Sequence, residues 1–125
     1  GSEVLLLLEG GNDLAALGEK GIGPATAAIE SMVAEAGRRG VLVYLATLPP
    51  QRPGGSRATF IDLLPRYNDW MRRIARDRGA TLVDVEAAFG SDLSLLSADG
   101  LHPTVEGYRV MAQAFADAIA RTLQR

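Results

Sequence analysis

The chain has 125 residues and a mass of 13.2 kDa, the size of a single domain that can form a core without disulfides or metals. Its net charge of −2 excludes the basic surface of a nucleic-acid or anionic-membrane binder, and no apolar run is long enough to span a bilayer. A hydrophobic content of 47% excludes general disorder, and the absence of cysteine excludes disulfide scaffolds, thiolate zinc sites and cysteine nucleophiles.

The chain opens on Gly1-Ser2, a pair with the composition of a remnant of tag removal. The continuous apolar run Val4–Leu8 follows and predicts a strand buried on both faces, as in a parallel sheet. Glu9–Asp13, with two glycines, is expected to be the loop that ends this strand. Apolar residues then recur at helical spacing and predict a helix from Pro24 to about Gly37.

The middle of the chain repeats this order of strand, loop and helix. Val41–Ala46 is the second buried run, and Thr47–Arg57, rich in proline and glycine, is predicted to be a loop. A helix is expected over roughly residues 59–78, and Pro65 should begin a segment or kink one there. Thr81–Val85 is the third predicted strand.

The last part of the chain is a long connection, Glu86–Pro103, followed by a helix over about 104–123. The alternation of strands and helices predicts an α/β fold, a single domain over residues 1–125 in which helices cover a parallel sheet. Ligands of such sheets bind beyond the carboxyl ends of the strands. Chemistry is therefore expected from the three loops at that edge, Glu9–Asp13, Thr47–Arg57 and Glu86–His102.

The only histidine of the chain, His102, lies three residues after Asp99. An aspartate at this spacing can accept the Nδ1 proton, which orients the ring and leaves Nε2 free as a general base. Pro103 and Thr104 open the last predicted helix, which places the pair at a helix entrance on the active edge. The alternative interpretation is a surface Asp-Gly turn beside a solvated histidine.

Gly10-Gly11-Asn12-Asp13 follows the first predicted strand. Two glycines let the backbone turn sharply and approach a ligand closely, which makes Gly10 and Gly11 candidate substrate-binding residues. The amide of Asn12 can donate a hydrogen bond to an oxyanion. The alternative is a strand-to-helix turn in which Asn12 or Asp13 caps a following helical turn.

The other polar and aromatic clusters favour structural roles. Arginines and aspartates interleave along the second long predicted helix, which indicates a solvated face with local ion pairs. Trp70 and Phe89 are candidates for an acyl pocket, with core packing as the favoured alternative. No spacing diagnostic of a metal site joins the side chains with suitable chemistry, Asp13, Asp92, Asp99 and His102. We expect neither a metal nor a cofactor.

The two motifs, in this order and setting, carry a resemblance to a known family. A buried strand that ends in Gly10-x-Asn12-Asp13, with Asp99-x-x-His102-Pro103 at the entrance of the last helix, resembles the SGNH (GDSL-type) hydrolases. Further likeness, spread over the whole chain, lies in Leu45–Pro50, Tyr67-Asn68 and Gly79-Ala80.

The resemblance implies a flavodoxin-like three-layer α/β/α fold and hydrolysis of small esters by a serine. By position, it implies that Asn12 is an oxyanion donor, His102 the general base and Asp99 the acid that orients it. It also implies that Gly10 shapes the oxyanion loop.

The chain departs from the family pattern at the nucleophile. The family's Gly-Asp-Ser block, which follows its first strand, is not in this sequence, and neither is the block that supplies a glycine oxyanion donor. No serine lies in a G-x-S-x-G elbow either; the serines are Ser2, Ser31, Ser56, Ser91, Ser94 and Ser97. We therefore expect an N-terminally incomplete domain in which Val4–Leu8 is a free sheet edge. Such an edge pairs with a separate N-terminal segment or with a second copy.

The leading hypothesis is an ester hydrolase with a serine acyl-enzyme mechanism, to which this chain supplies Asn12 and the Asp99–His102 pair. A non-catalytic fragment or binding module that keeps the fold is the alternative from another class, and acyl transfer to a sugar hydroxyl would use the same motifs. The expected partner is a small ester substrate, with no nucleic acid and no membrane. The sequence indicates no compartment.

Overall fold

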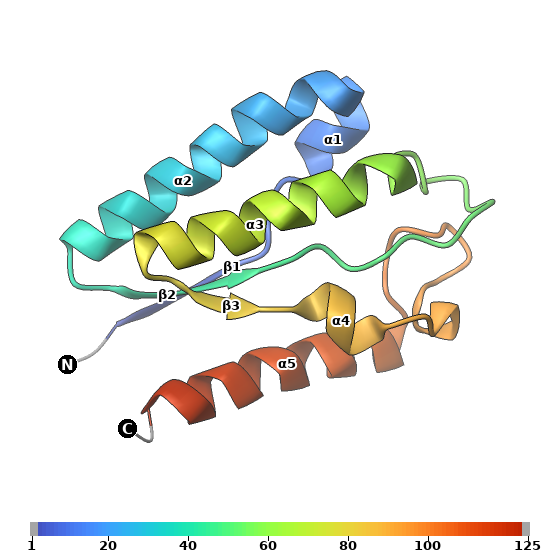
Figure 1. The fold of residues 1–125 in the computed structure, drawn as a ribbon. Coiled ribbons are helices and arrows are strands. Elements are labelled where there is room, and N and C mark those ends of the chain that lie inside the picture. The colour runs from blue at the N-terminus through green and yellow to red at the C-terminus, as the bar shows by residue number, and fades with distance from the viewer. Residues whose placement is uncertain (1–2, 124–125) are drawn as a thin grey trace.

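The computed structural model describes residues 3–123, so Gly1-Ser2, interpreted above as a tag remnant, lies outside the described residues. These residues form three layers, a parallel sheet between two layers of helices (Figure 1). The strands, in sheet order, are β1 (Val4–Leu7), β2 (Leu42–Ala46) and β3 (Thr81–Val83). The helices are α1 (Gly11–Leu17), α2 (Ile22–Arg38), α3 (Leu64–Arg78), α4 (Val85–Phe89) and α5 (Val105–Leu123). The predicted α/β fold is confirmed.

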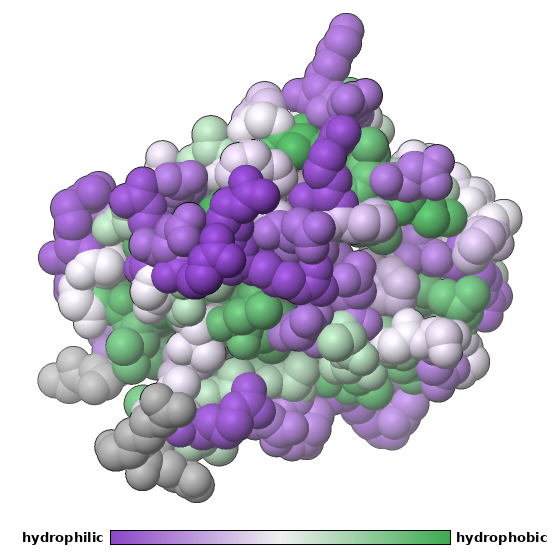
Figure 2. Space-filling model, in the orientation of Figure 1, coloured by the Kyte–Doolittle hydropathy of each residue, from purple (hydrophilic) through white to green (hydrophobic). Residues whose placement is uncertain are grey.

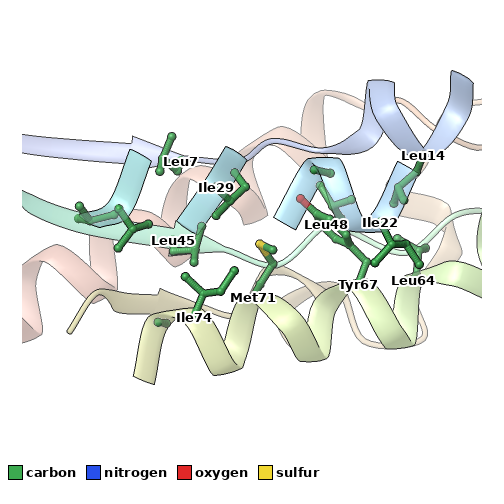
Figure 3. Packing of buried hydrophobic residues seen from close by; sticks show 14 of the residues in the cluster. Leu7, Leu14, Ile22, Ile29, Leu45, Leu48, Leu64, Tyr67, Met71 and Ile74 are labelled. Carbon is green, nitrogen blue, oxygen red and sulfur yellow. The ribbon is translucent and has the colours of Figure 1, made fainter. Parts of the chain in front are cut away.

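The larger core lies between the sheet and the layer of α2 and α3 (Figure 3). In the register of the sheet, Leu7 pairs with Leu45, and both side chains are buried in this core. Ile29 of α2 and Met71 of α3 close over them. Because the sheet advances from β1 to β3 by crossovers of one hand, both crossover helices lie on the same face.

The opposite face of the sheet is only partly covered. Tyr44 and Val83 are buried in a second cluster under α5, which packs against β2 and β3. On β1 the expectation of burial on both faces was wrong, because Val4 and Leu6 are 44% and 48% exposed. Leu42, the neighbour of Val4 on β2, is 45% exposed. β1 is thus an edge strand with an uncovered apolar face.

Several element boundaries differ from those that the sequence predicts. α1 begins inside the segment expected to be a loop, Glu9–Asp13. β3 ends at Val83, because the Asp84 carboxylate accepts a hydrogen bond from the Ala87 amide and caps α4. Pro65 lies in the first turn of α3, so it begins this helix, as predicted.

Hydrophilic side chains gather over α3, as Figure 2 shows, in agreement with the predicted solvated helix face. Arg72 is an exception to that prediction. It is only one-third exposed and pairs with Asp69, Asp84 and Glu86. No helix in residues 3–123 combines the length and the apolar character that crossing a membrane requires.

A buried polar network fixes the start of the loop after β2. Asn68 of α3 is fully buried; its Oδ1 accepts from the Leu48 amide at 2.8 Å, and its Nδ2 donates to the Leu48 carbonyl at 3.0 Å. Nδ2 also donates to Glu86. Thr47, also fully buried, accepts from the Glu86 amide and donates to Asp84. The two loops that follow β2 and β3 are therefore held together where they leave the sheet.

Candidate active site

The three loops expected to carry the chemistry meet at one pocket of about 280 Å³ beyond the carboxyl ends of the strands. The first loop and the start of α1 contribute Asn12, the loop after β2 contributes Leu48, and the last connection contributes His102. The complete lining is Leu8, Glu9, Gly11, Asn12, Leu48, Pro49, Phe60, Leu101, His102, Pro103, Tyr108 and Met111. Most of these side chains are apolar, and the polar groups come from Glu9, Asn12, His102 and Tyr108.

The Asp99–His102 pair is formed. The His102 Nδ1 lies 2.6 Å from Asp99 Oδ2, and the His102 amide donates to Asp99 Oδ1 at 2.9 Å. With Nδ1 bonded to the carboxylate, the Nε2 atom is the one left for proton transfer. The His102 side chain is half-exposed, has Asp99 as its partner and borders the pocket.

Hydrogen bonds hold the Asp99 carboxylate in its charged form. The His102 side chain and the amides of His102 and Leu101 all donate to it, and the Ser97 hydroxyl adds a further hydrogen bond at 3.0 Å. These donors keep the pKa of Asp99 well below its usual range, with the His102 side chain as the largest cause. A charged acceptor strengthens the same hydrogen bonds and fixes the turn that carries the imidazole.

The first loop is shaped by a close contact between Gly10 and Tyr67. Gly10 has a φ of 110°, and a Cβ there would overlap the Tyr67 hydroxyl. Tyr67 is fully buried and donates its hydroxyl to the Glu9 carbonyl at 2.8 Å. Burial raises the pKa of Tyr67, so the phenol keeps the proton that it donates. The Gly10 carbonyl then accepts from the Leu14 amide and starts α1.

Asn12 and Gly11 line the pocket, whereas Gly10 lies behind it against Tyr67. Asn12 is an exposed residue in the first turn of α1. Within residues 3–123 its side-chain amide has no hydrogen-bond partner, so the alternative of a capping role does not describe it. The structure thus brings Asn12 and His102 to one pocket, from opposite ends of the chain.

None of the serines among residues 3–123 lines this pocket. Ser97 is the serine closest in sequence to the Asp99–His102 pair, but its hydroxyl hydrogen-bonds the Asp99 carboxylate instead of the His102 imidazole. Ser94 likewise bonds Asp92. These serines act as turn and cap residues.

The apolar wall of the pocket comes from residues that sequence reasoning missed. Phe60, at the end of the loop after β2, and Tyr108 and Met111, in the first turns of α5, line it. Phe89 is instead buried in the core beneath α5, and Trp70 stacks beneath the Arg73 guanidinium, 4.5 Å from its ring centre. The helical spacing of Tyr108 and Met111, just after His102, is the signal that could have found them.

Of the side chains considered for metal binding, Asp99 and His102 are bonded to each other, but the four do not form one group. Residues 3–123 hold no group of three or more acidic or histidine side chains placed to bind a metal ion. Asp13 and Asp92 lie outside the lining of the pocket.

Replacing Gly10 with alanine should lower the free energy of unfolding by about 2–5 kcal/mol, from left-handed backbone strain and overlap with Tyr67. Urea denaturation measures this change. Gly37→Ala is the matched control, because a Cβ at this helical position meets no atom within 4 Å. Its stability should stay the same or rise by up to about 1 kcal/mol. Equal stability of the two variants would contradict the proposed packing.

Asp99 should remain ionised below about pH 3.9, the ordinary midpoint of an aspartate. Because its folded-state pKa is depressed, the ionised group adds stability above the unfolded-state pKa. That stability is lost as the pH falls through the folded-state value. A carboxyl ¹³C NMR titration checks this, and in His102→Ala the midpoint should rise. An ordinary midpoint in the unmodified chain would show that the pair does not form.

Solved structures share this architecture. An acetylxylan esterase from Geobacillus stearothermophilus matches 94% of the chain with a TM-score of 0.75 and 24% identity. A GDSL-like lipase from Bacteroides thetaiotaomicron matches 95% with a TM-score of 0.73 and 23% identity. An α/β hydrolase enzyme from the metagenome of Lake Arreo, Spain, matches 93% with a TM-score of 0.73 and 26% identity. The chain spans 59%, 62% and 59% of these proteins, respectively.

No sequence match was found among curated proteins. A family model, described as the GDSL-like Lipase/Acylhydrolase family, matches residues 2–110, a span that includes both motifs of the pocket. The sequence resemblance, the fold and this match agree, and the chain belongs to the GDSL-like lipase/acylhydrolase family.

Proposed function

We propose that this chain forms the acid–base and oxyanion-binding part of an ester hydrolase that works through a serine acyl-enzyme. The observation that carries the proposal is one pocket that holds both a histidine bonded to a carboxylate and an asparagine amide with no hydrogen-bond partner in residues 3–123. Membership of a lipase and acylhydrolase family supports it.

The proposal gives one task to each of His102, Asp99 and Asn12. His102 Nε2 would take the proton of the serine hydroxyl as its oxygen attacks the ester carbonyl carbon, and Asp99 would stabilise the resulting imidazolium. The Asn12 amide would donate to the oxyanion. When the carbon–oxygen bond to the alcohol breaks, Nε2 returns the proton to the leaving alcohol. Water, deprotonated by the same nitrogen, then attacks the acyl carbon; the bond to the serine oxygen breaks, Nε2 returns the proton to that oxygen, and the acid leaves.

The serine would come from a segment outside these 125 residues. This inference rests on the pocket lining, which includes no serine, and on the free edge of β1. A strand added parallel to β1 would end at the same edge of the sheet as Leu8 and Glu9, which already border the pocket. A residue just after such a strand would face Asn12 and His102.

The pocket favours a small acyl group. Its apolar walls include Leu48, Phe60 and Met111, in a volume of about 280 Å³. One structural neighbour is an acetylxylan esterase, which makes acetyl esters the first substrates to assay.

Labelling with a reactive phosphonate ester, followed by intact-mass measurement, tests the assignment. The 125-residue chain should gain no adduct, whereas the longer protein that includes the serine segment should gain one.

In that longer protein, His102→Ala should abolish the adduct and lower kcat by at least about 10³-fold. Asn12→Ala should lower kcat by roughly 10²–10³-fold, with KM little changed. Gln113→Ala, an amide replaced on the exposed side of α5, is the control and should leave kcat unchanged.

Two results would overturn the assignment. An adduct on the 125-residue chain that His102→Ala removes would place the nucleophile inside this chain. An adduct in the longer protein that persists in His102→Ala would remove the histidine from its role as base.

We propose that this segment pairs with the free backbone edge of β1 and covers its exposed apolar face, and that in its absence a second copy of the chain does so. A lysine at Leu6 should oppose that association because it places a charge on the apolar face. The isolated chain should associate as its concentration rises, and Leu6→Lys should remain monomeric in analytical ultracentrifugation. Leu17→Lys is the matched control, since Leu17 is similarly exposed but lies on α1. A monomeric unmodified chain at high concentration would refute self-association.

A further inference from the structure

The loop after β2 is hydrogen-bonded to the turn that carries Asp99. The Arg57 amide donates to the Asp99 carbonyl at 2.8 Å, and the Arg52 amide donates to the Gly100 carbonyl at 2.9 Å. Within the loop, the Gly55 amide donates to the Arg52 carbonyl at 3.2 Å. Two successive carbonyls of the Asp99 turn are therefore held by amides on either side of a tight turn.

The two backbones touch where Gly55 meets Gly100. A Cβ on Gly55 would overlap the Asp99 carbonyl oxygen and lie 2.5 Å from the Gly100 Cα. In return, a Cβ on Gly100, which has a φ of 79°, would lie 2.7 Å from the Arg52 carbonyl oxygen. Only a residue without a side chain allows this approach at Gly55, since the obstructing atoms belong to the backbone and cannot rotate away.

The base of the loop is closed by Gln51. Its side chain is almost fully buried, and its Oε1 accepts from the Phe60 amide at 3.1 Å. Phe60 is part of the apolar wall of the pocket. The loop is thus joined to the site at two places, through Phe60 and through the Asp99 turn.

The Asp99 turn is held from its other side as well. The Ser97 amide donates to the His102 carbonyl at 2.8 Å, and Leu96 forms an antiparallel bridge with Pro103. These contacts within the turn do not use the Asp99 and Gly100 carbonyls. The loop after β2 supplies the donors for both.

We infer that the segment Gln51–Phe60 acts as a clasp, whose amides hold the backbone that carries the Asp99–His102 pair. Gly55 is the positioning residue, because these hydrogen bonds depend on the close backbone approach that it allows. The clasp sets the backbone from which the Asp99 carboxylate reaches Nδ1. Loss of the hydrogen bonds from the Arg52 and Arg57 amides would release the carboxylate from the imidazole. His102 would then populate both neutral tautomers instead of the Nδ1-protonated form alone. This inference deepens the proposed function, because the pair is its general base.

The test reads the imidazole directly and needs no turnover. A long-range ¹H–¹⁵N NMR correlation reports which nitrogen of a neutral imidazole carries the proton, and the chain has a single histidine. In the unmodified 125-residue chain, Nδ1 should carry the proton. In Gly55→Ala, the Nε2-protonated form should become the major one, and the amides of Arg52 and Arg57 should lose protection from hydrogen exchange.

Controls separate positioning from general loosening. Ser56→Ala changes the next, exposed residue, whose side chain has no hydrogen bond within residues 3–123, and it should keep the tautomer of the unmodified chain. Gly37→Ala repeats the same chemical change in α2 and should also keep it. Should Gly55→Ala not fold, Gln51→Leu opens the base of the clasp without a clash and should shift the tautomer in the same direction.

A Gly55→Ala chain that folds with Nδ1 still protonated would overturn the inference, as would an unchanged tautomer in Gln51→Leu when only that variant folds. Because the tautomer is read without substrate, this result stays separate from any failure of the esterase assays. In the longer protein, the expected consequence of Gly55→Ala is a fall in kcat.

Discussion

The hydrogen bonds of one carboxylate organise the active edge of this protein. Asp99 Oδ1 accepts from Ser97, Leu101 and His102, and Oδ2 bonds the imidazole of His102. The same donors lower the pKa of Asp99, and the retained charge strengthens each of them. The conformation of the turn, the charge of the carboxylate and the orientation of the imidazole therefore depend on one another.

The loop after β2 links this turn to the rest of the fold. At its beginning, Asn68 and Thr47 hold it to α3 and to the segment after β3. Farther along, its amides hold the Asp99 and Gly100 carbonyls, and Phe60 closes one wall of the pocket. A segment rich in proline and glycine suits this linking role. The prolines restrict its backbone, and the glycines let it approach another backbone closely.

The two faces of the sheet have different roles. The face under α2 and α3 is covered along all three strands and provides most of the buried core. On the other face α5 packs against β2 and β3, while Val4 and Leu6 on β1 stay exposed. The pocket lies at the end of this incompletely covered region, since Leu8 and Glu9 follow β1 directly. The proposed position of the nucleophile and the uncovered apolar face thus both adjoin β1.

The order of strands and helices, the parallel sheet and the two motifs could be predicted from the sequence, because apolar periodicity and the local spacing of Asp99 and His102 depend only on neighbouring residues. Sequence reasoning missed α1, since glycine at its start reads as a loop, and it could not separate the buried from the exposed side of Val4–Leu7. The three-dimensional fold was needed to show that Phe60 and Tyr108, instead of Trp70 and Phe89, form the pocket wall. It alone also showed that Gly55 lies against the Asp99 turn. Such contacts join residues far apart in the chain, and their distances are set by how the layers pack, which no local pattern encodes.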